Sequence, residues 1–206
     1  ENVGADWAEI APALRLDGRI GPHAYIRPGL GLAGGNLERD LATALRLAEE
    51  TGSDARVVRA WAVDSAYRRD WALRVLHEAV VAGDGEPTIA LLGLAYKANT
   101  GSTKNSPALS LIAALGGCRF RAYDPAVAAA GLGLPGVEPA PSALDACQGA
   151  TALAVMTPWP EFAELAADDI AGRLAGNTVV DPFGVLDASA YRAAGLYYRT
   201  LGRPAD

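Results

Sequence analysis

The spacing of apolar residues divides this chain into a helical first part and a later part in which strands and helices alternate. In the first part, apolar side chains recur every three or four residues, as in amphipathic helices. This spacing predicts helices over residues 7–16, 38–51 and 54–81, the last with a broad apolar stripe that includes Trp61 and Trp71. Because such a stripe is unfavourable in water, it predicts a packing partner, which is either a second copy of the chain or another helix of the same chain.

A turn-rich segment at residues 82–87 separates these helices from a second pattern. Short apolar runs typical of buried strands follow at residues 88–95, 118–123, 151–156, 178–181 and 196–200. Helical segments are predicted between them, at residues 107–115, 142–147, 160–174 and 188–194. This alternation is typical of a doubly wound parallel sheet with helices on both faces. The sequence therefore predicts an α/β protein with a helical region over residues 1–83 and a Rossmann-like doubly wound parallel sheet over residues 84–206.

Composition narrows the class of protein. With 206 residues, of which 50% are hydrophobic and 20% charged, the chain can bury a sizeable core. A net charge of −6 gives no general attraction for nucleic acid or for an anionic membrane, and no run of eighteen apolar residues occurs. Two histidines and two widely separated cysteines offer no metal-ligand spacing. We expect a cytoplasmic protein that uses no metal, nucleic acid or membrane.

The segment richest in candidate chemistry is RIGPHAYIRPGLGLAGGNLERDL, which runs from Arg19 to Leu41. Its glycines at positions 29, 31 and 34 have the G-x-G-x-x-G spacing of a dinucleotide fingerprint. That fingerprint requires a strand before the first glycine, whereas YIRPG precedes these glycines and a helical pattern follows them. We therefore reject a dinucleotide fingerprint and predict a loop whose backbone approaches another ligand, because so many glycines are costly to order without one. A plain connecting loop is the alternative.

The same segment resembles the substrate loop of the UDP-glucose/GDP-mannose dehydrogenase family. In that family R-I-G and P-G-x-G-[FL]-x-G lead to a nucleophilic cysteine, followed four residues later by an aspartate. The resemblance continues through four further blocks: GLAYKANTGSTKNSPA at residues 93–108, AYDP at 122–125, TPWPEF at 157–162 and YRAAGLYYRTLGRP at 191–204. Several blocks in the right order are more specific than any one of them. They imply the second half of a longer protein that forms a homodimer through its long helix.

The resemblance implies an NAD-dependent oxidoreductase that acts on a CH–OH group of a nucleotide diphosphate sugar. NAD and the catalytic lysine and asparagine would belong to an N-terminal domain absent from this chain. The family forms a carboxylate by two hydride transfers through a thiohemiacetal on its cysteine, but that position holds Asn36, whose amide cannot form the adduct. We therefore expect one hydride transfer, between alcohol and carbonyl. The alternatives are a catalytically silent relative that binds the sugar or only dimerises, and slow acid formation with Asp40 as the base for a water.

The resemblance also assigns roles to single residues. Asp40 and Asn36 would be the catalytic pair, although a first-turn helix acid and a helix N-cap are the alternatives for them. The expected substrate-binding residues are Arg19, which would reach the neighbouring subunit or form a surface salt bridge, and Tyr25, Arg27, Gly29, Gly31, Gly34 and Lys97. Lys104 is expected at the cofactor. Lys104 and Phe183 replace arginine of the family pattern and, with Asn36, indicate an altered ligand or altered chemistry.

Overall fold

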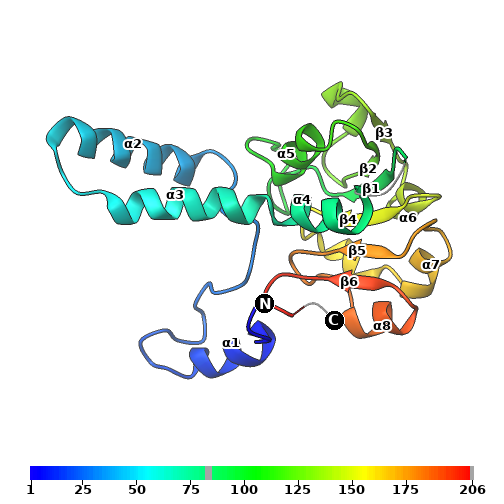
Figure 1. Cartoon of the computed structure of the whole chain (residues 1–206), viewed down its shortest axis with the longest axis horizontal. Helices are drawn as coiled ribbons and strands as arrows, with labels where there is room; N and C mark the ends of the chain where they lie inside the picture. Colours follow the sequence, from blue (N-terminus) through cyan, green and yellow to red (C-terminus); the bar gives the residue numbers. More distant parts are fainter. Residues whose placement is uncertain (82–84, 205–206) are drawn as a thin grey trace.

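A computed structural model describes residues 1–81 and 85–204 of the chain. Within these ranges a six-stranded parallel sheet forms the middle of the compact part of the molecule, on the right in Figure 1. Its strands are β1 (Thr88–Leu92), β2 (Arg119–Tyr123), β3 (Val137–Pro139), β4 (Ala152–Val155), β5 (Thr178–Val180) and β6 (Tyr197–Arg199). Their order in the sheet is β3-β2-β1-β4-β5-β6, and every neighbouring pair is parallel. This order changes direction between β1 and β4, which confirms the predicted doubly wound α/β fold.

The apolar runs of the sequence form the middle of this sheet. In β1, Ile89 to Leu92 have no exposed surface, and neither have the four residues of β4. Strands buried on both faces need such continuous apolar runs. The helices that flank the sheet are α4 (Trp71–Leu76), α5 (Pro107–Ala114), α6 (Ala143–Cys147), α7 (Ala167–Ala171) and α8 (Ala188–Ala193), with 3₁₀ turns η2 (Ala129–Leu132) and η3 (Pro160–Glu164).

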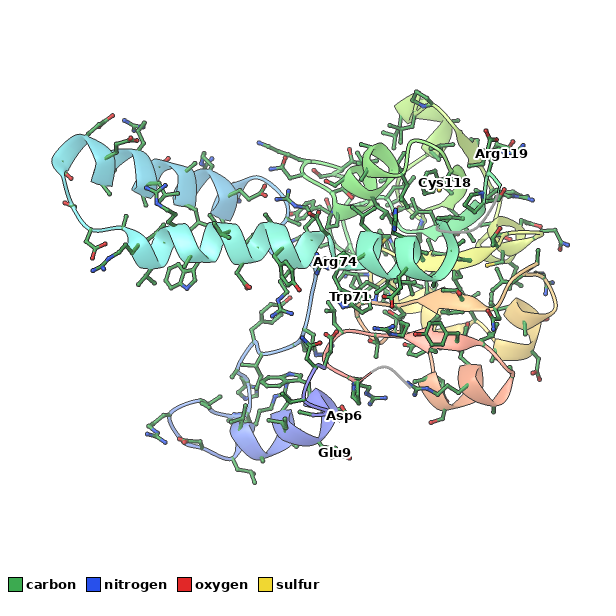
Figure 2. The ribbon with its side chains drawn as sticks, in the orientation of Figure 1. Asp6, Glu9, Trp71, Arg74, Cys118 and Arg119 are labelled. Atoms are coloured by element: carbon green, nitrogen blue, oxygen red, sulfur yellow. The ribbon has the colours of Figure 1, made fainter. Side chains whose placement is uncertain are left out.

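The predicted long helix over residues 54–81 is wrong as a single element. The structure divides it into α3 (Arg56–Arg69), α4 and a π-helical turn, η1 (His77–Val81), with a break at Asp70. Trp71 is 5% exposed and packs in the core of the sheet region, whereas Trp61 is 59% exposed (Figure 2). The apolar stripe therefore consists of two surfaces, and α4 finds its partner within the chain.

The remaining helices of the first part project from the sheet region. Helix α2 (Asn36–Thr51) packs against α3 to form a hairpin, and α1 (Trp7–Arg15) lies apart from it (Figure 1). The structure describes every residue of these two helices, and among them only Ser65 is buried. Exposed apolar residues on the hairpin are Leu37, Leu47, Val57, Trp61, Val63 and Tyr67. The hairpin thus leaves an apolar surface that the described part of the chain does not cover.

Two smaller predictions about secondary structure also differ from the structure. The helix predicted over residues 160–174 is a 3₁₀ turn followed by α7, because Leu165 and Ala166 are extended between them. Strand β3 was not predicted, since three residues that end in a proline at the sheet edge are too short to show a period. The predicted turn at residues 82–87 lies partly outside the described residues. No described helix combines the length and apolar character needed to span a membrane.

Candidate functional site

Two adjoining cavities border the glycine loop, and the larger one lies between the helical first part and the sheet. The larger, of about 1670 Å³, is bordered by α1, the loop that follows it, and residues just beyond the carboxyl ends of four strands. These are Lys97 after β1, Pro158 after β4, Phe183 after β5 and Thr200 after β6. Open α/β sheets bind ligands at this edge, beside the point where the strand order reverses. The larger cavity is therefore the strongest candidate ligand site among the described residues.

The charge of this cavity is opposite to that of the whole chain. Its described lining includes one carboxylate, Asp187, and four cationic side chains, Arg15, Arg27, Lys97 and Arg203, although the chain has a net charge of −6. The carboxylate of Asp187 already accepts two backbone N–H groups at the start of α8. A concave surface with a local excess of positive charge concentrates anionic ligands.

A buried carboxylate fixes two of the loops that border the cavity. Asp124, directly after β2, is 8% exposed. It accepts hydrogen bonds of 2.6 to 3.1 Å from the backbone N–H groups of Leu94, Ala95, Ala126 and Val127 and from the indole N–H of Trp159. It thereby ties the loop after β1, which leads to Lys97, to the loop after β4. A sequence signal existed for this residue, an aspartate that ends an apolar strand, but we assigned it no role.

A second buried carboxylate places Phe183. Asp181 has no exposed surface and accepts hydrogen bonds from the N–H groups of Phe183 (3.2 Å) and Leu186 (2.8 Å) and from the Tyr198 hydroxyl (2.7 Å). Burial raises the pKa of the Asp181 carboxyl, although these hydrogen bonds act in the opposite direction. The ring of Phe183 then lies 4.0 Å from the point that a β-carbon on Gly29 would occupy. An apolar ring therefore faces the glycine loop where the family pattern has an arginine.

The glycine loop packs closely on the protein itself. A β-carbon on Gly31 would lie 2.8 Å from the Ser65 hydroxyl oxygen, and one on Gly34 would lie 2.8 Å from the Tyr96 ring. The Ser65 hydroxyl also accepts a hydrogen bond from the N–H of Leu32. These contacts explain the need for glycine at both positions without a ligand. In addition, residues 1–81 contain no strand, so they do not form the strand, turn and helix of a dinucleotide fingerprint.

Asn36 is the first residue of α2 and is exposed to solvent. The N-cap is Gly35, so the expected capping role of Asn36 is wrong. The start of α2 is held instead by Asn105, whose amide donates to the carbonyl oxygen of Gly34 at 2.6 Å and to the carboxylate of Glu38. Lys104 lies beside the same turn, with its Nζ 2.7 Å from the point that a β-carbon on Gly35 would occupy.

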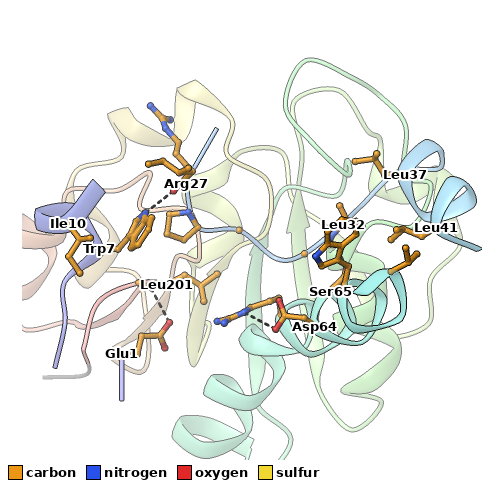
Figure 3. A pocket seen from close by; sticks show the side chains of 18 of the residues that line it. Glu1, Trp7, Ile10, Arg27, Leu32, Leu37, Leu41, Asp64, Ser65 and Leu201 are labelled. Atoms are coloured by element: carbon orange, nitrogen blue, oxygen red, sulfur yellow. Dashed lines mark hydrogen bonds and ion pairs between the residues drawn. The ribbon is translucent and has the colours of Figure 1, made fainter. Parts of the chain in front are cut away.

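The smaller cavity, of about 1010 Å³, lies between α1, the glycine loop and the α2–α3 hairpin (Figure 3). Apolar side chains from all three elements line it, among them Trp7, Leu32 and Leu41. Asp40 also borders it, but its side chain is 63% exposed and lies 3.3 Å from Arg39. The Asp40 carboxylate is therefore largely open to water and already paired with a neighbouring cation.

The two native thiols lie away from both cavities. Cys118 and Cys147 are buried and free. Burial raises the pKa of Cys147 to about 12 and also raises that of Cys118. Neither thiol can therefore supply the nucleophile that is missing at Asn36.

The structure divides the expected site residues into three groups. Those that border the larger cavity are Tyr25, Arg27, Gly29, Gly31 and Lys97. Asp40 borders only the smaller one, and Arg19, Gly34, Asn36 and Lys104 border neither. Arg19 pairs with Asp17 through its Nε at 3.0 Å and is 90% exposed, which matches the surface salt bridge that we considered as its alternative. The positively charged cavity residues that sequence reasoning missed are Arg15 and Arg203.

Comparisons with known proteins match both parts of the chain to one protein family. Residues 1–64 match the central domain of the UDP-glucose/GDP-mannose dehydrogenase family, and residues 90–188 match its UDP binding domain. UDP-glucose 6-dehydrogenase TuaD of Bacillus subtilis (strain 168) is 29% identical over 209 residues, which span 100% of this chain and 45% of that protein. UDP-glucose 6-dehydrogenase AglM of Haloferax volcanii is 34% identical over 202 residues, covering 96% of this chain and 45% of that one.

The fold comparison agrees. A UDP-glucose dehydrogenase from Pyrobaculum islandicum superposes with a TM-score of 0.82 at 25% identity, over 99% of this chain and 45% of the other. The chain thus spans about half the length of the relatives it matches. The order of the motifs, the two family matches and the shared fold together show that this chain belongs to the UDP-glucose/GDP-mannose dehydrogenase family.

Proposed function

We propose that this chain is the nucleotide-sugar-binding half of an NAD-dependent oxidoreductase that acts on a CH–OH group of a nucleotide diphosphate sugar. The observation that carries the proposal is the larger cavity, which combines four cationic side chains with the carboxyl edge of a doubly wound sheet. Both matched domains contribute to it, since Arg27 lies in the first and Lys97 in the second. The UDP-glucose dehydrogenases among the relatives indicate UDP as the nucleotide to test first.

The same cavity has places for both ends of a nucleoside diphosphate. Cationic side chains suit the two phosphates, and the aromatic rings of Tyr25, Tyr96 and Phe183 offer surfaces on which a base can stack. The described residues form no dinucleotide fingerprint, so NAD would be held by residues outside this chain. We therefore expect the chain to bind UDP and to leave NAD unbound.

Titration calorimetry tests this directly. The chain should bind UDP, and Lys97→Ala should weaken that binding about tenfold, because a charged hydrogen bond to phosphate is worth roughly 1.5 to 3 kcal/mol. Arg119→Ala is the matched control, since it removes one exposed positive charge at the amino end of β2, away from the cavity (Figure 2). A chain that binds NAD but not UDP, or an equal loss in both variants, contradicts the assignment.

The chemistry that we propose stops at one oxidation. Conversion of an alcohol to a carbonyl removes one hydride and one proton and requires no covalent intermediate, whereas the second oxidation in this family uses a thiol. Asn36 has no thiol, and the thiols of the two cysteines are buried away from both cavities. The exposed Asp40–Arg39 pair favours a second candidate, a relative that binds the sugar without oxidising it. Counting reduced cofactor per sugar consumed by the complete polypeptide separates one, two and no oxidations.

We also propose that the α2–α3 hairpin mediates a homodimer. Its exposed apolar residues include Trp61 near the centre of α3, and an exposed apolar surface of this kind is typical of a protein–protein interface. Light scattering at high micromolar concentration should give twice the mass of the chain. Trp61→Asp should shift the protein to monomer, whereas Leu16→Asp, at an equally apolar exposed position off the hairpin, should not. A wild-type monomer at that concentration rules out this interface.

A further inference from the structure

The last described residues of the chain meet its first ones beside the larger cavity. Leu201, Gly202 and Arg203, which we call the clasp, follow β6 after one residue, Thr200. The carbonyl of Gly202 accepts a hydrogen bond from the backbone N–H of Trp7 at 2.6 Å, and its N–H donates to the Glu1 carboxylate at 3.1 Å. Arg203 completes the contact with an ion pair of 3.3 Å to Asp6.

From Trp7 the contact continues to the glycine loop. The indole N–H of Trp7 donates to the carbonyl of Ile26 at 2.8 Å, two residues before Pro28 (Figure 3). Trp7 and Pro28 both border the larger cavity, as do Leu201 and Arg203. The clasp, the start of α1 and the start of the glycine loop therefore form one continuous wall of that cavity.

Gly202 is the residue on which this packing depends. Its φ is +80°, and a β-carbon there would lie 2.8 Å from the Trp7 β-carbon and 3.1 Å from Cγ of Pro28. Both distances are shorter than a carbon–carbon contact of about 3.5 Å allows. Any side chain at position 202 would thus push α1 and the glycine loop away from the sheet. Little else holds α1, since Ala11 is its one buried residue.

We propose that the clasp is a positioning element that holds α1 and the glycine loop over the carboxyl edge of the sheet and thereby sets the affinity of the larger cavity for a nucleoside diphosphate. The statement about affinity rests on the proposed function. The cationic groups Arg15 and Arg27 belong to the segment that the clasp holds, whereas Lys97 belongs to the sheet region. Displacement of the segment would separate these charges, so the phosphates would lose part of their contacts while the sheet stays folded.

Gly202→Ala and Gly195→Ala form a matched pair that tests the clasp. Gly195 has a φ of +81°, so alanine strains the backbone equally there, but nothing lies within 4 Å of its would-be β-carbon. Calorimetry should show UDP affinity about tenfold lower in Gly202→Ala than in Gly195→Ala, as expected when one charged contact is lost. The unfolding midpoint of Gly202→Ala should lie only slightly below that of Gly195→Ala, because the backbone strain is the same, the sheet core is untouched and only the clasp contacts are lost. Equal UDP affinities overturn the proposal.

Trypsin gives a readout that does not depend on nucleotide binding. Arg15 and Arg19 lie in the held segment, each followed by a residue other than proline, and we expect cleavage after them to be several-fold faster in Gly202→Ala than in Gly195→Ala. If the wild-type chain binds no UDP, the proposed function fails, and these rates alone decide the clasp: faster cleavage supports it and equal cleavage overturns it. Should Gly202→Ala not fold, Trp7→Phe, which loses the bond to Ile26, must show the same two changes to a smaller degree; wild-type behaviour overturns the proposal.

Discussion

Replacing Asn36 with cysteine should create one thiol that reacts at least about a hundred times faster than either native cysteine. Position 36 is exposed and begins the sixteen-residue helix α2, whose N-terminus lowers the pKa of a thiol. The ammonium of Lys104, beside the same turn, acts in the same direction. Burial instead raises the pKa of Cys147 to about 12. Ellman's reagent added to the native chain should therefore titrate one fast thiol in the variant and none in the wild type.

Ala42→Cys is the control for this result. It places a thiol at an exposed position of the same helix, away from the N-terminus, and should react about tenfold more slowly than a thiol at position 36. Equal rates would mean that the start of α2 does not activate a thiol.

The same Asn36→Cys change tests the proposed chemistry in the complete polypeptide. It should raise acid formation only in part, because position 36 borders neither cavity and a displacement of about 1 Å reduces the rate on the order of a hundredfold. If the wild type already yields two reduced cofactors per sugar and the variant changes nothing, Asn36 does not limit the reaction to one oxidation.

Replacing Asp124 with alanine should lower the free energy of unfolding by about 5 kcal/mol. Four backbone N–H groups and the indole of Trp159 lose their acceptor, and each buried donor left unsatisfied costs about 1 to 3 kcal/mol. Because water can enter and satisfy some of these donors, the expected value lies at the low end of their summed range. Urea unfolding followed by tryptophan fluorescence measures the change.

Asp187→Ala is the matched comparison for Asp124. Asp187 also accepts backbone N–H groups, at 2.9 and 3.1 Å, but at the exposed N-cap of α8, where the loss should be about 1 kcal/mol. Similar losses in the two variants would show that burial of Asp124 adds nothing, and that the loops after β1 and β4 are held by other contacts.

The sequence was sufficient for the sheet and for part of the site. Continuous apolar runs such as residues 88–92 have to be buried on both faces, so their alternation with helices determines a doubly wound sheet. The motifs predicted binding roles for Arg27 and Lys97 because each belongs to a local pattern, a glycine loop and a strand end, and both residues border the larger cavity. The helical spacing of apolar residues did not reveal where the stripe of residues 54–81 breaks. Trp61 and Trp71 both fit that spacing, and only the folded structure shows that Trp71 is buried and Trp61 exposed.

Only the tertiary structure decided which distant residues build the two cavities. Glu1 and Gly202 are 201 positions apart, and their contact follows from the return of β6 to the edge of the sheet, which no local pattern encodes. The role of Asp124 is likewise invisible until the loops after β1 and β4 converge on one carboxylate. Amino-acid periodicity determines which face of an element is buried, because that depends on neighbours in the chain. The assembly of a site depends on neighbours in space, which here come from both ends of the chain.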